Sequence, residues 1–144
     1  MNGDGKRCIL LVDDDEWVRS LISRLLERLG YCAVPVASGG AAIAWVTAGD
    51  TPFDLVILDM MMPDMSGEDT FLALRALKPS LFFILCSGSG ETAASDRLLS
   101  TGHCVLLGKP FSQAELRAKI EGLLSRPPPP PLPSDFPPAP AAAV

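Results

Sequence analysis

Apolar residues in this chain form short continuous runs that alternate with longer segments of helical period. The runs cover Cys8–Val12, 54–59, 81–86 and 104–107, with a weaker one at Cys32–Val36. Runs of this length without polar alternation are typical of strands that are buried on both faces of a parallel sheet. The weaker run contains Pro35, which cannot donate a ladder hydrogen bond, so we expect it at a sheet edge or a strand end.

The segments between these runs have the spacing of amphipathic helices. We expect helices over 18–29, 38–48, 67–77, 91–100 and 112–124. In the first, apolar residues recur at every third and fourth position, and Gly30 is a plausible residue to end it. Ser38 and Ser112 are expected N-caps, and Glu115 completes a capping box with Ser112. Strand and helix alternate five times, which predicts an α/β fold with a parallel sheet covered by helices on both faces.

Proline divides the chain into two parts. Nine of the 14 prolines lie between Pro127 and Pro140, so we expect a globular domain over 1–125 and a proline-rich tail over 126–144. A domain of that size can bury a core without disulfides or metals. The charges of Arg126 and Asp135 cancel, so the net charge of −5 belongs to the globular domain.

The tail is predicted to be extended, with polyproline II conformation where prolines are consecutive. It contains P-x-x-P spacings of the kind that SH3-like grooves bind. A stiff spacer or a disordered end is the plainer interpretation, and a link to a further domain is compatible with both.

Composition narrows the classes of function. A sequence pI near 4.7 argues against direct nucleic-acid binding, which needs a basic surface. No apolar run reaches the roughly 18 residues of a membrane span, and the N-terminus lacks signal-peptide features. The four cysteines are scattered, which favours small buried side chains in a reducing cytoplasm over disulfides or a zinc site.

Polar residues follow the apolar runs at the ends where a parallel sheet binds ligands. The predicted strand ends carry Asp13, Asp14 and Asp15, then Asp59, Ser87 and Lys109. Carboxyl ends of neighbouring strands meet at one edge, so these groups are expected to converge. An open site of carboxylate oxygens suits Mg²⁺. A lysine and a hydroxyl beside it favour phosphoryl transfer to a carboxylate.

Four motifs in order carry a resemblance to a known family. The segments LLVDDDE, DLVILDMMMPDMSG, FFILCSG and LLGKPF resemble the receiver domain of two-component response regulators (the CheY-like superfamily). The resemblance extends from Cys8 to about Ser125. It implies a flavodoxin-like (βα)₅ fold with strand order 2-1-3-4-5.

The resemblance also implies a role for individual residues. Asp59 matches the phosphoacceptor, Asp13 and Asp14 match the acid pair that binds Mg²⁺, and Asp14 is the expected direct ligand. Met61 falls where the family lends a backbone carbonyl to the metal. Ser87 matches the switch hydroxyl and Lys109 the lysine that pairs with the phosphoryl group.

Two further positions follow from the resemblance. The Lys109–Pro110 bond is expected to be cis. The family often has an aromatic residue three positions before the lysine, and this sequence has Leu106 there. A ring flip therefore cannot be the readout of phosphorylation.

The expected function is a receiver that accepts a phosphoryl group from a sensor histidine kinase or a phosphotransfer protein and then contacts a downstream protein target. It would be cytoplasmic, without direct nucleic-acid binding or membrane insertion. It would not be an enzyme in the usual sense, although it would assist its own phosphotransfer and slow autodephosphorylation. The alternatives are a degenerate receiver that only binds proteins, which Leu106 favours, and a small phosphatase with an aspartate nucleophile. We expect Trp17 to pack on its helix with some exposure, close enough to report Mg²⁺ binding.

Overall fold

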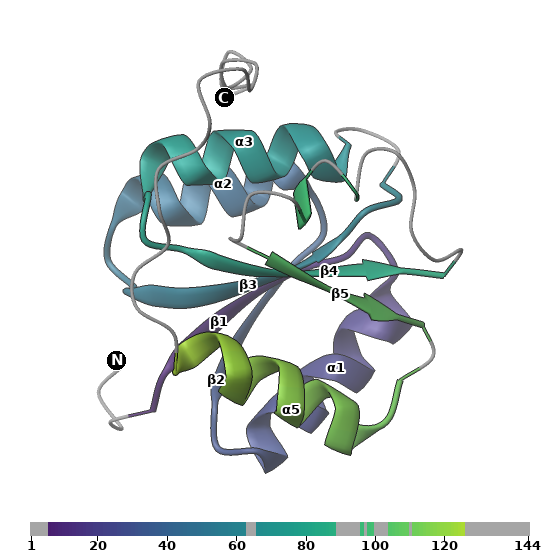
Figure 1. Cartoon of the computed structure of the whole chain (residues 1–144). Coiled ribbons are helices and arrows are strands. Elements are labelled where there is room, and N and C mark those ends of the chain that lie inside the picture. Colours follow the sequence, from purple (N-terminus) through teal and green to yellow (C-terminus); the bar gives the residue numbers. More distant parts are fainter. Residues whose placement is uncertain are drawn as a thin grey trace.

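The computed structural model contains one sheet of five parallel strands in the order β2-β1-β3-β4-β5 (Figure 1). It describes residues 6–62, 66–88, 96, 98–99, 104–109 and 111–125. The strands are β1 (Cys8–Val12), β2 (Cys32–Val36), β3 (Phe53–Asp59), β4 (Phe82–Ser87) and β5 (Cys104–Gly108). The helices are α1 (Glu16–Arg28), α2 (Gly39–Ala48), α3 (Gly67–Leu77) and α5 (Gln113–Leu124).

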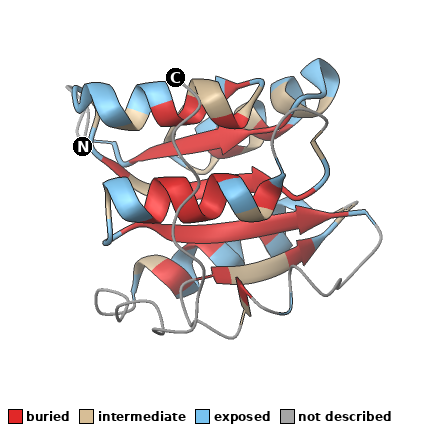
Figure 2. Cartoon of the chain, turned by 90° about the horizontal axis from the view of Figure 1, so that it is seen from above, coloured by how far each residue is buried: buried red, intermediate tan, exposed pale blue. Residues whose placement is uncertain are grey.

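Helices cover both faces of the sheet. Helices α2 and α3 lie on one face, and α1 and α5 lie on the other (Figure 1). Side chains alternate between these faces along each strand. The residues of the central strands are buried, and those of the edge strands are partly so (Figure 2). In β1, Leu10 packs in the core that includes Phe71 of α3, whereas Ile9 packs in the core that includes Leu26 of α1. The prediction of strands buried on both faces is confirmed for β1, β3 and β4, whereas the edge strands β2 and β5 are only partly buried.

The predicted elements differ from the observed ones mostly at their ends. The first two strands have the predicted bounds, and the other three shift by one residue at one or both ends. Strand β2 is an edge strand, as predicted from Pro35, which has no backbone N–H to donate. Pro35 lies opposite Leu11 of β1. Of the helix expected over 91–100, the described residues Asp96, Leu98 and Leu99 are helical. The Lys109–Pro110 bond and the tail lie outside the described residues.

Side chains that precede the helices satisfy the first backbone amides. Ser38 caps α2, Ser66 caps α3, and Ser112 with Glu115 forms a complete capping box on α5. Gly30 follows α1 at φ 94°, a left-handed conformation that favours glycine. These local signals explain why α2, α3 and α5 begin close to where the sequence predicts; α1 begins two residues earlier than predicted, after the Asp15 cap.

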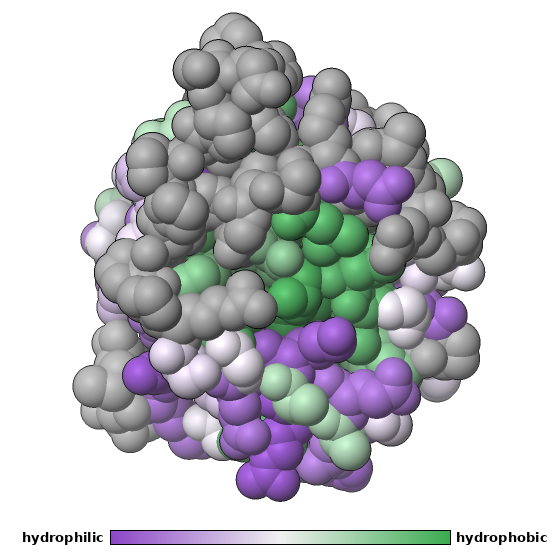
Figure 3. All heavy atoms as spheres, in the orientation of Figure 1, coloured by the Kyte–Doolittle hydropathy of each residue, from purple (hydrophilic) through white to green (hydrophobic). Residues whose placement is uncertain are grey.

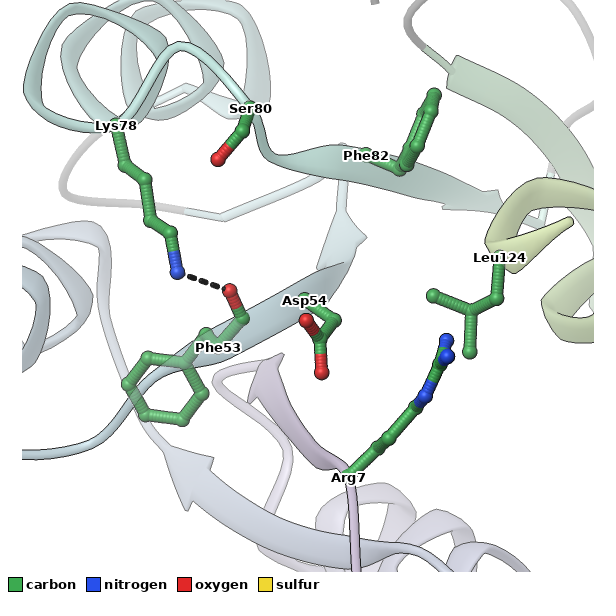
Figure 4. Close-up of a pocket in the computed structure, with 7 residues that line it drawn as sticks. All are labelled: Arg7, Phe53, Asp54, Lys78, Ser80, Phe82 and Leu124. Carbon is green, nitrogen blue, oxygen red and sulfur yellow. Dashed lines mark hydrogen bonds between the residues drawn. The ribbon is translucent and has the colours of Figure 1, made fainter. Parts of the chain in front are cut away.

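The two ends of the sheet differ in chemistry. At the amino end, a hollow of about 190 Å³ is lined by charged and apolar groups (Figure 4). There the Lys78 ammonium donates to the carbonyl of Phe53, and Arg7 and Asp54 lie nearby. The acids that the sequence singles out lie at the carboxyl end instead.

Hydrophobic surface gathers over β5 on the face viewed in Figure 3, between α3 and α5. Strand β5 lies at an edge of the sheet, and Val105 and Leu106 on it are only half-buried.

Within the described ranges, none of the helices has the length and apolar character needed to cross a bilayer.

Glycine at position 67 lets α3 approach the end of β3. A Cβ atom on Gly67 would lie 2.6 Å from the sulfur and 2.8 Å from the Cα of Met60. Met60 is buried and directly follows Asp59, the last residue of β3. The lack of a side chain at Gly67 thus allows α3 to begin in close contact with Met60, at the carboxyl end of β3.

We predict that Gly67→Ala lowers the free energy of unfolding by about 1–3 kcal/mol, because the Met60 backbone must shift. Gly122→Ala is the matched control, since a Cβ there meets nothing within 4 Å and alanine favours the helix. Urea denaturation of both variants and the parent measures the difference. Equal stability of Gly67→Ala and the parent would show that the approach is not constrained.

Candidate functional site

The site lies where the ends of β1, β3, β4 and β5 meet. Backbone pairing continues one residue past β1, β3 and β5. The amide of Asp13 donates to Val36 (3.1 Å), that of Met60 to Cys86 (3.1 Å), and that of Lys109 to Ser87 (2.9 Å). The residues predicted to act together are therefore held by the rigid part of the fold rather than by free loops.

Three carboxylates gather at this edge. Asp13, Asp14 and Asp59 each offer an oxygen, and these atoms all lie within 4.8 Å of one another. Asp13 and Asp59 are buried, with 2% and 6% of their surface exposed, whereas Asp14 is exposed. Close carboxylates in a partly desolvated place repel one another and favour a cation.

Asp13 is already engaged within the protein. One of its carboxylate oxygens accepts from the Asp15 amide (2.9 Å), and the other accepts from the Lys109 ammonium (3.1 Å). Arg19 donates to the carbonyl of Asp13 (2.8 Å). Asp15 caps α1 by accepting from the amides of Trp17 and Val18. Asp13 is thereby oriented toward Lys109, and Asp14 is left facing solvent.

Lys109 joins the two buried carboxylates. Its Nζ atom lies 3.1 Å from Asp13 Oδ2 and 3.7 Å from Asp59 Oδ1. Burial works against the ammonium, but the hydrogen bond with Asp13 and the charges of Asp59 and Asp13 outweigh it, so the pKa of Lys109 is raised. The lysine is therefore a fixed positive charge at neutral pH.

Asp59 has an environment that opposes its charge. Burial is the largest cause of the raised pKa of Asp59, and the negative charges of Asp13 and Asp14 add to it. The hydrogen bond from the Met61 amide (3.1 Å) and the charge of Lys109 act in the other direction. The ionised carboxylate at this position is thus held at a cost that a cation would relieve.

The other predicted residues lie around this cluster. Ser87 is buried at the end of β4, one residue past Cys86, which pairs with Asp59. Met61 contacts Asp59 through its amide, and its side chain is 69% exposed. Leu106 lies farther back in β5, opposite Leu85, and is half-buried. The fold brings all six predicted side chains or backbones to one edge, although their roles remain predictions.

Comparison with known proteins identifies the family. The model of the response regulator receiver domain matches residues 9–121. The chain belongs to this family. Receiver domains are signalling domains and generally not enzymes.

Relatives of this receiver domain include response regulators and sensor kinases. Transcriptional regulatory protein CpxR of Escherichia coli K12 is 38% identical over 120 residues, which are 82% of this chain and 49% of CpxR. Sensor kinase CckA of Brucella abortus is 32% identical over 122 residues, which are 85% of this chain and 13% of CckA. The receiver domain thus spans half or less of the length of these curated relatives.

Solved structures confirm the fold. A CheY-like response regulator receiver domain protein from Methanospirillum hungatei JF-1 has a TM-score of 0.76 and 28% identity to this chain. The match covers 83% of this receiver domain and 94% of that protein. The strand order 2-1-3-4-5 is the predicted flavodoxin-like order.

An apolar hollow of about 270 Å³ adjoins the site of this receiver domain. Lys109 lines it together with residues of α1 and the segment that precedes α5. The apolar lining residues are Val18, Leu21, Ile22, Leu25 and Phe111.

Trp17 of α1 is 81% exposed, so the expectation that it packs on its helix is wrong. Its position at the first turn leaves the ring in solvent, because only its amide is held by Asp15.

Two contacts could not be found from the sequence. The hydrogen bond from Arg19 to the Asp13 carbonyl and the ion pair between Lys109 and Asp13 depend on side-chain directions. The spacing of six residues between Asp13 and Arg19 crosses from a strand end into a helix, and neither helical nor strand periodicity applies there.

We predict that Asp59→Asn stabilises the receiver domain in the presence of a chelator. Folding raises the pKa of Asp59, so ionisation costs stability as the pH rises through its titration. Removing that charge at pH 7 should raise the free energy of unfolding by roughly 1 kcal/mol and Tm by a few degrees. Thermal melts in EDTA measure the gain.

Asp54→Asn is the matched control, since it removes a carboxylate from the other end of the same strand. It should not share the gain. Adding Mg²⁺ should narrow the difference in Tm between Asp59→Asn and the parent, because the ion should stabilise the parent more. A less stable Asp59→Asn in EDTA would contradict the proposed repulsion.

Proposed function

We propose that this receiver domain accepts a phosphoryl group on Asp59 from a phosphohistidine of a sensor histidine kinase or phosphotransfer protein, in the presence of Mg²⁺. The observation that supports this most strongly is the cluster of three carboxylates with Lys109 placed 3.7 Å from Asp59. A carboxylate nucleophile, a counter-charge and a set of oxygen ligands for a divalent cation are the parts that aspartyl phosphorylation needs.

The donor set fits Mg²⁺. All of the donors are oxygens, and Asp14 is exposed, as suits an ion that keeps several of its waters. We propose that Asp14, Asp59 and the backbone carbonyl of Met61 hold the ion, with Asp13 beside them. When bound, Mg²⁺ would neutralise charge on the transferring phosphoryl oxygens.

Asp59 is the proposed nucleophile. A carboxylate oxygen forms a bond to phosphorus while the bond between phosphorus and the histidine nitrogen breaks, and that nitrogen keeps the electron pair. The Met61 amide holds Oδ1 of Asp59 at 3.1 Å and thereby limits rotation of the carboxylate. Restricting this rotation lowers the entropy that must be lost on reaction.

Lys109 and Ser87 would stabilise the product. Lys109 now pairs mainly with Asp13, at 3.1 Å, and lies only 0.6 Å farther from Asp59 (3.7 Å against 3.1 Å). A small movement of its side chain would bring the ammonium to a phosphoryl oxygen on Asp59. The Ser87 hydroxyl, at the end of the neighbouring strand, would donate a hydrogen bond to another oxygen. Both contacts favour the anionic product over the free carboxylate.

The apolar hollow beside Lys109 suits a phosphodonor protein. A donor must place its histidine at Asp59, and a partner that buries apolar side chains against Leu21, Leu25 and Phe111 would be held at the edge of the site. A downstream protein would then recognise the phosphorylated surface. We infer a cytoplasmic setting, because kinases of this class meet their receivers there, and no direct role in nucleic-acid binding.

The signal cannot pass through an aromatic ring at position 106. Leu106 is a half-buried residue of β5, and hydrophobic surface is visible over this strand (Figure 3). We propose that movement of Ser87, at the end of β4, carries the signal instead. A degenerate receiver is the weaker alternative, because the acids, the hydroxyl and the lysine are all present. We also propose that the receiver domain ends near 125 and that 126–144 is a tail or linker.

We predict that acetyl phosphate with Mg²⁺ adds one phosphoryl group to the protein, because a small donor needs only the residues of the site. Intact-mass spectrometry measures the product. Asp59→Asn and omission of Mg²⁺ should each abolish it, and Lys109→Ala should slow it by roughly 10²-fold. Absence of phosphorylation in the folded parent would refute the proposal and leave the binding-module alternative.

We also predict that Mg²⁺ changes the fluorescence of Trp17. The Asp15 carboxylate accepts from the Trp17 amide, and the Asp15 amide donates to Asp13, which belongs to the carboxylate cluster. Trp17→Phe should remove the change, and Trp45→Phe on α2 should keep it. A titration in which emission is flat, while calorimetry detects Mg²⁺, would show that the ring does not sense the cluster.

A further inference from the structure

Cys8 and Cys32 lie directly opposite each other on neighbouring strands. They begin β1 and β2, and they are partners in the parallel register of these strands. Side chains of such partners leave the sheet on the same side. Both residues belong to the core between the sheet and helices α2 and α3, Cys8 as a fully buried member and Cys32 as a half-buried one.

The spacing of these two positions suits a covalent link. Neighbouring strands lie about 4.8 Å apart, and disulfides join Cα atoms that are about 4.4–6.8 Å apart. The Cys32 amide also donates to the Arg7 carbonyl (2.8 Å), which holds the start of β2 against the residue before Cys8. The backbone therefore holds the two cysteine positions opposite each other.

The other two cysteines do not share this arrangement. Cys86 pairs with Asp59 and Leu107, and Cys104 pairs with Phe83. They also face opposite sides of the sheet, because Cys86 packs with α1 and α5 and Cys104 packs in the other core. The four cysteines thus contain one pair with the geometry for a link.

We propose that Cys8 and Cys32 form a reversible disulfide, so that the edge strand β2 is a thiol–disulfide modification site of this domain. The half-buried Cys32 is the entry point for a disulfide oxidant such as oxidised glutathione. Its thiolate attacks one sulfur of the oxidant and releases one molecule of thiol. The Cys8 thiolate then attacks the Cys32 sulfur of the mixed disulfide and releases the second thiol. One disulfide is reduced as one is formed, and two protons leave the cysteines.

The link would close a loop that contains α1 and the acid pair at the end of β1. Within the described residues β2 pairs only with β1, so the disulfide would add a covalent bond where the sheet has one neighbour. It acts on the amino ends of these strands, away from Asp59. The proposed modification site is therefore separate in space from the proposed phosphorylation site.

The test is thiol mapping of the full chain after treatment with oxidised glutathione, followed by alkylation and trypsin. Trypsin cuts after Arg7, Arg19 and Arg28, so Cys8 and Cys32 lie on different peptides. We expect loss of two of the four thiols, one linked peptide pair that contains Cys8 and Cys32, and its disappearance with dithiothreitol. Oxidation should raise Tm by roughly 5–10 °C.

Two variants separate the proposal from nonspecific oxidation. Cys32→Ser should keep its three remaining thiols under the same treatment, and this half-buried position tolerates the change. Cys104→Ala is the matched control that should still form the link. A stable glutathione adduct on Cys32 with Cys8 unmodified, covalent dimers, or equal loss of thiols in Cys32→Ser would each overturn the proposal.

Discussion

Repulsion among three carboxylates at one edge of the sheet is the constraint on which the rest of the site depends. Asp13 and Asp59 are buried there, Asp14 lies beside them, and Lys109 is shared between the two buried groups. One ammonium does not balance three negative charges. The folded domain therefore holds a charge imbalance that a divalent cation or a change of charge on Asp59 can relieve. This imbalance makes Asp59 responsive to its ligands, and it costs stability when none is bound.

The scaffold tolerates this cost because the backbone around it is tightly held. Ladder hydrogen bonds extend past β1, β3 and β5, so the acids and the lysine leave from paired backbone rather than from loops. Asp15 caps α1 directly after the acid pair, and Gly67 brings α3 onto Met60 directly after Asp59. Two apolar cores fix the strands from both faces. The stability that these contacts supply is what permits a strained cluster of charges at the edge.

Most of the fold was predictable because its signals are local. Continuous apolar runs identified the strands, and Ser38, Ser112 and Glu115 identified helix starts that the structure confirms. The convergence of Asp13, Asp59 and Lys109 followed from the rule that parallel strands share a carboxyl edge. The exposure of Trp17 and the pairing of Lys109 with Asp13 did not follow. These depend on which way a side chain turns once the elements have packed, and composition or periodicity carries no information about that choice.

The central claim is that Asp59, the acid pair and Lys109 form one phosphoryl and cation site. A crystal structure of the protein with Mg²⁺ and beryllium trifluoride, which mimics a phosphoryl group on a carboxylate, tests it most directly. The account predicts beryllium trifluoride bound through its beryllium atom to an Asp59 oxygen, and Mg²⁺ bound by Asp14, Asp59 and the Met61 carbonyl. It also predicts that Lys109 moves from Asp13 to a fluorine atom. An unmodified Asp59 with Lys109 still on Asp13, at saturating concentrations of both reagents, would contradict it.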